Sequence, residues 1–252
     1  MTRIMPNLEI MAKKVALWSY LLTATLAFPA QAAPQFDIFV KENSGPDFSG
    51  DGRPGQGTAG GSRGECPAVE GPGLTALMPS SNYGETLMEQ PTLWFYVPYA
   101  TEQVVRGEFS LQDEDGNDRT AFTLPEDIPG FVGIALPEAF SLDENIDYQW
   151  YLELHCIADG SPLFVNGWIQ RISPAAWTET SSPMSEKEFF IQNEIWFDAL
   201  DSLMHHSGND GITDEELQHW QVLTTAPGVL LEEFSEFVPE GTVISPPIVT
   251  DN

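Results

Sequence analysis

The stretch YQWYLELHCI, residues 148–157, decides the fold. Its core-forming residues occupy every second position: Tyr148, Trp150, Leu152, Leu154 and Cys156. A period of two is that of a β-strand with one buried face, because successive side chains of a strand point to opposite sides of the sheet. The stretch therefore predicts a strand that lines the core of a β-sheet and directs the Cys156 sulfur inward.

Further short segments of the same kind surround this strand. They cover residues 74–78, 93–97, 104–112, 119–124, 131–136 and 163–172. In one of them, Val105, Phe109 and Leu111 are expected to face the core, and an acidic turn follows at residues 113–118. About seven short strands separated by Pro, Gly, Asn and Asp turns favour an immunoglobulin-like antiparallel β-sandwich over residues 66–173, with a small β-barrel as the alternative.

The period changes after a break rich in Ser, Pro and Thr. Ser185 with Glu188, and Thr213 with Glu216, have the spacing of capping boxes that open α-helices. The first helix is expected to run to about His205 and the second to stop before Pro227. Residues 174–238 are therefore predicted to form a helical pair docked on the sandwich, and residues 239–252 a disordered tail.

The N-terminal region has the three parts of a secretory signal peptide. Lys13 and Lys14 precede an uncharged apolar run of 14 residues, 15–28, and small residues follow up to Ala32. A membrane-spanning helix needs about 20 apolar residues, so a signal peptide over residues 1–32 is favoured over an anchor. We therefore expect an exported protein, periplasmic or extracellular, with no integral membrane segment after cleavage; the chain start is expected at Met1 or Met11.

Residues 33–65 are expected to form a Gly-rich disordered arm, since the stretch 43–64 alone holds eight glycines and two prolines. Segments with so little apolar content bury too little surface to offset the entropy of ordering. The chain is also strongly acidic, with 10 basic and 38 acidic residues and a formal net charge of −28. Such a charge repels phosphate polymers and anionic lipids, which excludes nucleic acid as a partner.

Cys66 and Cys156 are the two cysteines of the chain. An even number of cysteines after a signal peptide favours a disulfide, because disulfides persist in oxidising compartments. Two buried free thiols are the alternative.

Seven sequence blocks resemble, in order, a family of cyanobacterial exported proteins known only as a domain of unknown function, family 928. The blocks are GGSRGECP at 60–67, LTAL with Pro79 at 74–79, PTLWFYVPY at 91–99, FSLQDEDGN at 109–117, YQW with Cys156 at 148–156, GWIQR at 167–171 and IWFDAL at 195–200. The resemblance covers roughly residues 60–235, with Phe197 where the family has Tyr. It implies export, a paired Cys66 and Cys156 and one β domain with appended helices, and it carries over no activity or ligand.

Four aromatic residues are the candidates for ligand binding: Trp94, Tyr96, Tyr99 and Trp168. If the apolar residues beside Trp94 and Tyr96 point into the core, these two rings point outward and can stack on sugars or contact a protein. The alternative is that the docked helical pair covers them.

Catalytic and metal signals are weak. Glu153 and His155 share the outward face of one strand, so they are an acid/base candidate or ordinary residues of an exposed sheet face. Residues 113–124, which begin with the acidic turn, and residues 206–217 both lack the glycine and glutamate positions of a calcium loop. Zinc at His205, His206, His219 and Asp201 has no recognised spacing. No catalytic residue, metal site or cofactor is therefore predicted.

These observations favour a non-catalytic interaction module of the cell envelope, whose partner is another envelope or secreted protein. The alternatives are a carbohydrate-binding module that uses the exposed aromatics, and an envelope hydrolase that uses Glu153 and His155.

Overall fold

The fold is described from a computed structural model, which covers residues 45–58, 65–113, 117–126, 128–173, 185–205 and 212–246, without the side chains of 117–119. The predicted signal peptide lies outside these residues. So do residues 114–116 of the predicted acidic turn, His206 and the last six residues. None of the helices in the described ranges combines the length and the apolar character needed to cross a membrane.

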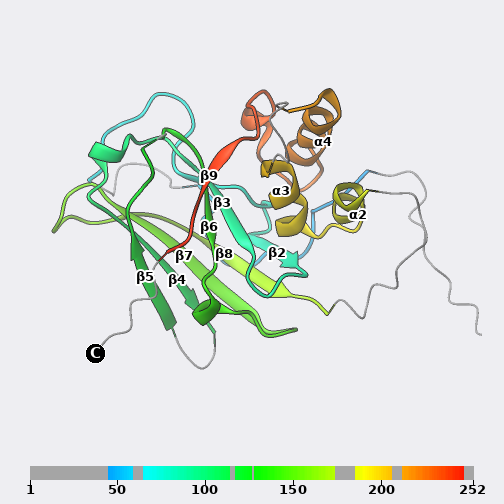
Figure 1. The fold of residues 1–252 in the computed structure, drawn as a ribbon, viewed down its shortest axis with the longest axis horizontal. Coiled ribbons are helices and arrows are strands. Elements are labelled where there is room, and N and C mark those ends of the chain that lie inside the picture. The colour runs from blue at the N-terminus through cyan, green and yellow to red at the C-terminus, as the bar shows by residue number, and fades with distance from the viewer. Residues whose placement is uncertain are drawn as a thin grey trace, which may run out of the picture. The chain divides into compact units, whose positions relative to one another are not determined.

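In the part of the chain that the structure describes, nine strands form two sheets. The strands are β1 (Thr75–Ala76), β2 (Tyr83–Thr86), β3 (Thr92–Val97), β4 (Arg106–Gln112), β5 (Asn117–Phe122), β6 (Gly130–Ala135), β7 (Asp147–His155), β8 (Leu163–Arg171) and β9 (Gly241–Ile244). One sheet has the order β1-β3-β6-β9 and the other β2-β8-β7-β4-β5. The helices are α2 (Glu186–Gln192), α3 (Trp196–Met204) and α4 (Asp214–Thr224), with short 3-10 turns at η1 (Thr101–Gln103), η2 (Glu138–Phe140) and η4 (Glu232–Phe234). Figure 1 shows the three α-helices gathered on one side of the sheets.

The predicted β-sandwich with C-terminal helices is confirmed, and no closed barrel forms among the described strands. Phe95 of β3 and Trp150 of β7 meet between the sheets, with ring centroids 5.5 Å apart. Two pairings are parallel, β2 with β8 and β6 with β9, so the sheets are mixed and not purely antiparallel. In β7 the predicted alternation holds, since Tyr148, Trp150, Leu152 and Leu154 are all buried.

Val105 does not face the core as predicted. Phe109 and Leu111 are buried, but Val105 is 56% exposed. The regular pairing of β4 begins one residue later, at Arg106 opposite His155, so Val105 lies just before the strand and outside the core layer.

Among its described residues, the helical region holds three α-helices and not a pair. Both predicted capping boxes are present, at Ser185 with Glu188 and at Thr213 with Glu216. The first predicted helix is interrupted at Glu194, whose backbone has a φ of 62°, and the amide of Ile195 donates to the Phe190 carbonyl across the break. The break redirects the chain so that α3 lies against β2 and β3.

Residues 45–58, here called the N-terminal strap, pack against the sandwich and do not form the expected disordered arm. Phe48 is buried, and its ring meets Trp196 at 4.9 Å. Farther along, Gln56 of the strap forms a β-bridge with Asn166 of the five-stranded sheet. Thr58 forms another with Thr75 of the four-stranded sheet. Open sheet edges leave unpaired N–H and C=O groups, and the strap satisfies some of these, which explains why a Gly-rich segment is ordered there.

The C-terminal part also differs from the expected disordered tail after residue 239, because β9 pairs in parallel with β6. The short runs Phe131–Ile134 and Gly241–Ile244 form this pairing. It extends the four-stranded sheet at the edge opposite β1.

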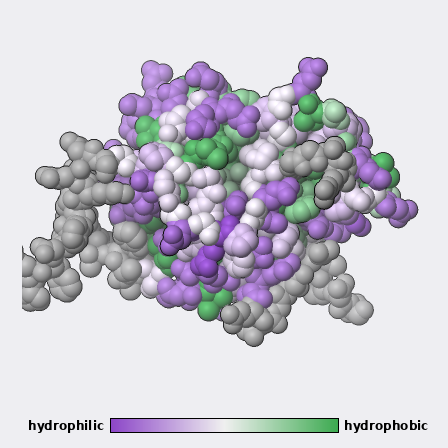
Figure 2. All heavy atoms as spheres, turned by 180° about the vertical axis from the view of Figure 1, so that it is seen from behind, coloured by the Kyte–Doolittle hydropathy of each residue, from purple (hydrophilic) through white to green (hydrophobic). Residues whose placement is uncertain are grey.

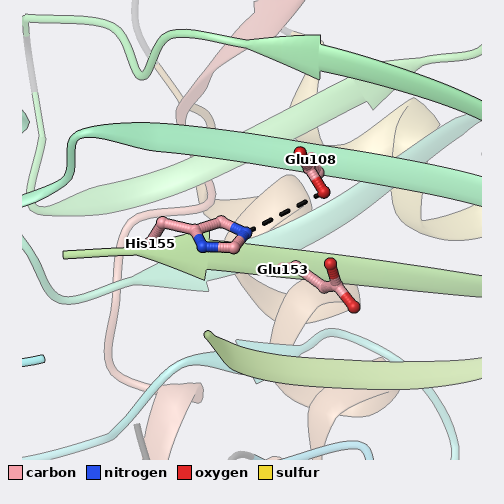
Figure 3. A group of neighbouring side chains, drawn as sticks. All are labelled: Glu108, Glu153 and His155. Carbon is pink, nitrogen blue, oxygen red and sulfur yellow. Dashed lines mark ion pairs between the residues drawn. The ribbon is translucent and has the colours of Figure 1, made fainter. Parts of the chain in front are cut away.

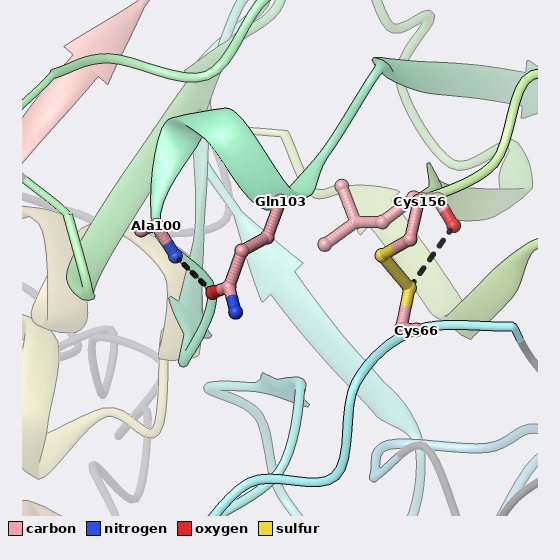
Figure 4. Close-up of a disulfide and its surroundings, with 5 residues drawn as sticks. Cys66, Ala100, Gln103 and Cys156 are labelled. Atoms are coloured by element: carbon pink, nitrogen blue, oxygen red, sulfur yellow. Dashed lines mark hydrogen bonds between the residues drawn. A yellow bond between two sulfur atoms is a disulfide. The ribbon is translucent and has the colours of Figure 1, made fainter.

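Cys66 and Cys156 are bonded, which confirms the predicted disulfide (Figure 4). The bond joins the chain just before the first strand to the end of β7, across a sequence separation of 90 residues. Both cysteines are partly buried and pack against the core.

Candidate functional site

The four predicted ligand-binding aromatics do not form one surface. Trp94 is 1% exposed and Tyr99 is 4% exposed. Tyr96 packs among Phe131, Phe234 and Phe237, and burial raises the pKa of its hydroxyl. The helical region therefore covers Trp94 and Tyr96, as the alternative prediction has it.

Trp168 lies apart from the other three, on the outer face of the five-stranded sheet. Its indole N–H donates to the Pro54 carbonyl of the N-terminal strap at 2.8 Å. Tyr83 is its direct neighbour on β2. The guanidinium of Arg53 lies over both rings, 5.4 Å from the Tyr83 centroid and 5.9 Å from that of Trp168. Asp147 completes this arrangement with an ion pair to Arg53 at 2.5 Å.

A groove of about 580 Å³ opens beside Arg53. The strap, the loop between β1 and β2, strand β2 and the junction between α2 and α3 form its walls. Among the described residues, four carboxylates line it, those of Asp47, Asp51, Glu85 and Glu194, together with the guanidinium of Arg53. The aromatic lining residues are Phe48, Tyr83 and Trp196. Among the described lining residues, carboxylates thus outnumber the guanidinium, while Phe48 and Trp196 are themselves buried.

The groove carboxylates influence one another. Burial raises the pKa of Glu85, the Tyr83 hydroxyl hydrogen bond opposes this, and the charge of Glu194 adds to the rise. The Glu194 carboxylate accepts a hydrogen bond from the Asp47 amide at 3.1 Å. A cation placed between Glu85 and Glu194 would relieve their repulsion, because opposite charges favour the ionised form of a carboxyl group.

A second group of polar residues lies on the outer face of the five-stranded sheet (Figure 3). Strand β4 supplies Arg106 and Glu108, and β7 supplies His155 and Glu153 directly opposite them. We call these four residues the His155 cluster. His155 is 8% exposed, so it is not the exposed partner of Glu153 that the sequence suggested.

The third polar group lies between α3 and the sandwich, and two carboxylates of α3 contact the sandwich there. Asp198 accepts hydrogen bonds from the Leu87 amide at 3.2 and 3.3 Å. Asp201 accepts from the Trp94 indole N–H at 2.7 Å and pairs with His205 at 3.1 Å. These contacts join α3 to β3 and to the loop after β2. Because both acids are engaged in packing the helix, we assign them a structural role.

Burial raises the pKa of Asp198 to about 6, against 3.8 for an unperturbed aspartate. The folded protein therefore binds this proton more tightly than the unfolded chain. The resulting stabilisation is complete below pH 3.8 and is lost as the pH rises through 6. We expect the stability difference between Asp198→Asn and the wild type to change by roughly 2 kcal/mol between pH 8 and pH 4.5. Urea titrations of both proteins at the two pH values measure this, and parallel pH profiles would contradict it.

On the face seen in Figure 2, hydrophobic residues lie in small groups among hydrophilic ones. The exposed large apolar residues are scattered in the sequence and include Val105, Ile157 and Leu230. Broad apolar docking surfaces mark many protein interfaces, and the visible part of this face offers none. Charge and shape at the groove are the more distinctive surface features.

Comparison with known proteins identifies the family. Residues 58–236 match the family described as Domain of Unknown Function (DUF928), and the chain belongs to this family. A comparison with curated proteins finds no match. Among solved structures, the chain is similar to the fn3 domain of the human collagen alpha-1(XX) chain at 13% sequence identity and a TM-score of 0.24. That match covers 50% of this chain and 99% of the collagen domain.

Sequence reasoning missed three residues that shape the groove: Arg53, Glu85 and Glu194. Arg53 stands in a Gly-rich segment that the sequence assigns to an arm, and its basic charge in so acidic a chain was the available signal. Glu194 reaches the groove because the chain breaks between α2 and α3. No glycine or proline marks that break in the sequence.

Proposed function

We propose that this protein is a non-catalytic, exported interaction module of the cell envelope that binds a basic segment of a partner protein in the groove. The disulfide and the lack of a membrane-crossing helix in the described ranges are compatible with export. The acidic lining of the groove is the observation that carries the proposal.

The contacts of Arg53 within the molecule support the proposal that the partner segment contains arginine. One guanidinium is placed over two aromatic rings and paired with Asp147 at the edge of the groove. Cations over aromatic faces and paired with carboxylates are a common form of guanidinium recognition. The remaining carboxylates can receive further basic side chains, and a formal net charge of −28 favours the approach of a basic partner.

Burial of Trp94 removes the basis for a carbohydrate-binding module at Trp94 and Tyr96, since sugar stacking requires an accessible ring. The groove therefore replaces the aromatic pair as the proposed binding surface.

A fluorescent peptide of alternating arginine and glycine tests the proposal. We expect the full chain to bind it in a salt-dependent manner, because exposed charge pairs are screened by ions. The double variant Glu85→Gln and Glu194→Gln should bind about tenfold more weakly, since each lost ion pair is worth about 0.5–1 kcal/mol. Fluorescence anisotropy measures both affinities.

The matched control is the double variant Glu102→Gln and Glu138→Gln, which removes the same charge from exposed positions in η1 and η2. It should keep wild-type affinity. Equal weakening in both double variants would mean that net charge alone attracts the peptide, and no binding by the wild type would reject the proposal.

A further inference from the structure

The His155 cluster places two acidic side chains directly opposite each other on neighbouring strands. Glu108 of β4 and Glu153 of β7 are register partners. Like charges in directly opposite positions of a sheet repel each other, so such a pair calls for a cation close by. The side chain of Glu108 is only 14% exposed, so water screens this repulsion less than it would at an exposed position.

Arg106 supplies part of that positive charge, and it supplies it to one acid only. Its guanidinium lies 3.0 Å from a Glu108 oxygen. Within the described part of the chain, Glu153 forms no ion pair and its side chain no hydrogen bond. One of the two facing carboxylates therefore lacks a cation.

His155 directs a ring nitrogen into the cluster. Its Nε2 lies 3.8 Å from Glu108 and 3.4 Å from an Arg106 nitrogen. Because a guanidinium nitrogen can only donate, the contact with Arg106 fits the neutral imidazole with an unprotonated Nε2. Nδ1 is buried and has no hydrogen-bond partner among the described residues. Figure 3 shows the Nε2 side of the ring directed toward Glu108.

We propose that Glu108, Glu153 and His155 form a binding site for a divalent transition-metal ion, with zinc as the ion that suits it best. One donor atom from each residue lies within 4.8 Å of the others. Donors around tetrahedral zinc stand about 3.3 Å apart, given metal–ligand distances near 2.0–2.1 Å. We expect rotations of the two glutamate side chains to close this gap of about 1.5 Å while the strands stay fixed.

The donor set selects the class of metal. One imidazole nitrogen and two carboxylate oxygens suit zinc and its neighbours in the first transition row, whereas calcium prefers oxygen ligands alone. Three protein ligands leave a fourth position of zinc open to water. The site lies on the five-stranded sheet, its residues are not among those that line the groove, and it does not depend on the proposed partner binding.

Arg106 is the competitor of the metal in this arrangement. Its side chain is 47% exposed, so it can turn toward solvent when a metal enters. Removal of Arg106 should therefore strengthen metal binding. A purely structural ion-pair cluster predicts no such gain, so this variant separates the two interpretations.

Isothermal titration of zinc chloride into the chelator-treated full chain tests the proposal. We expect binding of one zinc ion per chain, and a loss of affinity of more than about tenfold in both Glu153→Gln and His155→Ala. Arg106→Ala should bind zinc several-fold more tightly than the wild type. Calcium chloride should give no comparable binding.

His219→Ala is the matched control, because His219 also carries a buried ring nitrogen without a partner but lies on α4. It should bind zinc as the wild type does. Thermal melting without zinc identifies any variant that fails to fold, and Glu153→Gln keeps the test valid if His155→Ala is such a variant. The site assignment is wrong if the wild type takes up no zinc, if Glu153→Gln binds normally, or if Arg106→Ala binds more weakly.

Discussion

Replacing Cys66 and Cys156 with alanine should lower the free energy of unfolding by about 4–5 kcal/mol. The disulfide closes a loop with a sequence separation of 90 residues. Opening so long a loop releases conformational freedom in the unfolded chain, which favours unfolding. Urea denaturation of the double variant, followed by tryptophan fluorescence, measures the loss.

Wild-type protein in reducing agent is the control for this experiment. It should lose the same stability as the double variant, because both lack the covalent link. The double variant itself should not respond to the reducing agent. Equal stability of the wild type and the variant under oxidising conditions would show that the bond does not hold the sandwich together.

Trp196→Ala should destabilise the protein by about 3–5 kcal/mol, as large-to-small changes of buried tryptophan do. Trp196 is 1% exposed at the first turn of α3. Its indole N–H donates to the Leu77 carbonyl at 2.9 Å, and its ring meets Phe48 of the N-terminal strap. One side chain therefore joins the helical layer, the sandwich and the strap. Urea titration measures the change.

Two further variants separate the causes. Trp196→Phe keeps most of the apolar volume but leaves the Leu77 carbonyl without its donor, so a smaller loss of about 1–3 kcal/mol is expected. Val222→Ala changes a residue of α4 that is 38% exposed, and its effect should stay within about 0.5 kcal/mol. A loss below about 1 kcal/mol in Trp196→Ala would mean that α3 is not anchored there.

The sandwich was predictable because its signals are local. Alternation in β7 and the turn residues between strands each act over a few positions, and both capping boxes are fixed by pairs three residues apart. The disulfide could also be predicted, since the chain has two cysteines. The alternation and the capping boxes depend on neighbouring residues and not on the assembled fold, and the disulfide had a single possible pairing.

The features that sequence reasoning missed depend on tertiary contacts. The strap is Gly-rich, and its order comes from sheet edges that are far away in the sequence, such as Asn166. Short strand β9 is held by β6 in the same way. The His155 cluster needs the register of β4 against β7, which places Glu108 opposite Glu153. No periodicity in one segment reveals such a register.

The candidate aromatics show the same limit at the level of single residues. The alternation in β3 correctly gives Trp94 and Tyr96 a common face that points away from the space between the two sheets. Whether that face meets solvent or another layer depends on where α3 and η4 dock. Trp168 was distinguishable from these two only after its position on the other sheet was known.

Hydrogen–deuterium exchange of the full chain, with and without the arginine–glycine peptide, tests most directly whether the groove is the binding surface. We expect slower amide exchange in residues 47–53 and 81–85 when the peptide is bound, and no change in α4 (Asp214–Thr224). Protection confined to the helices, or unchanged exchange along the groove, would contradict it.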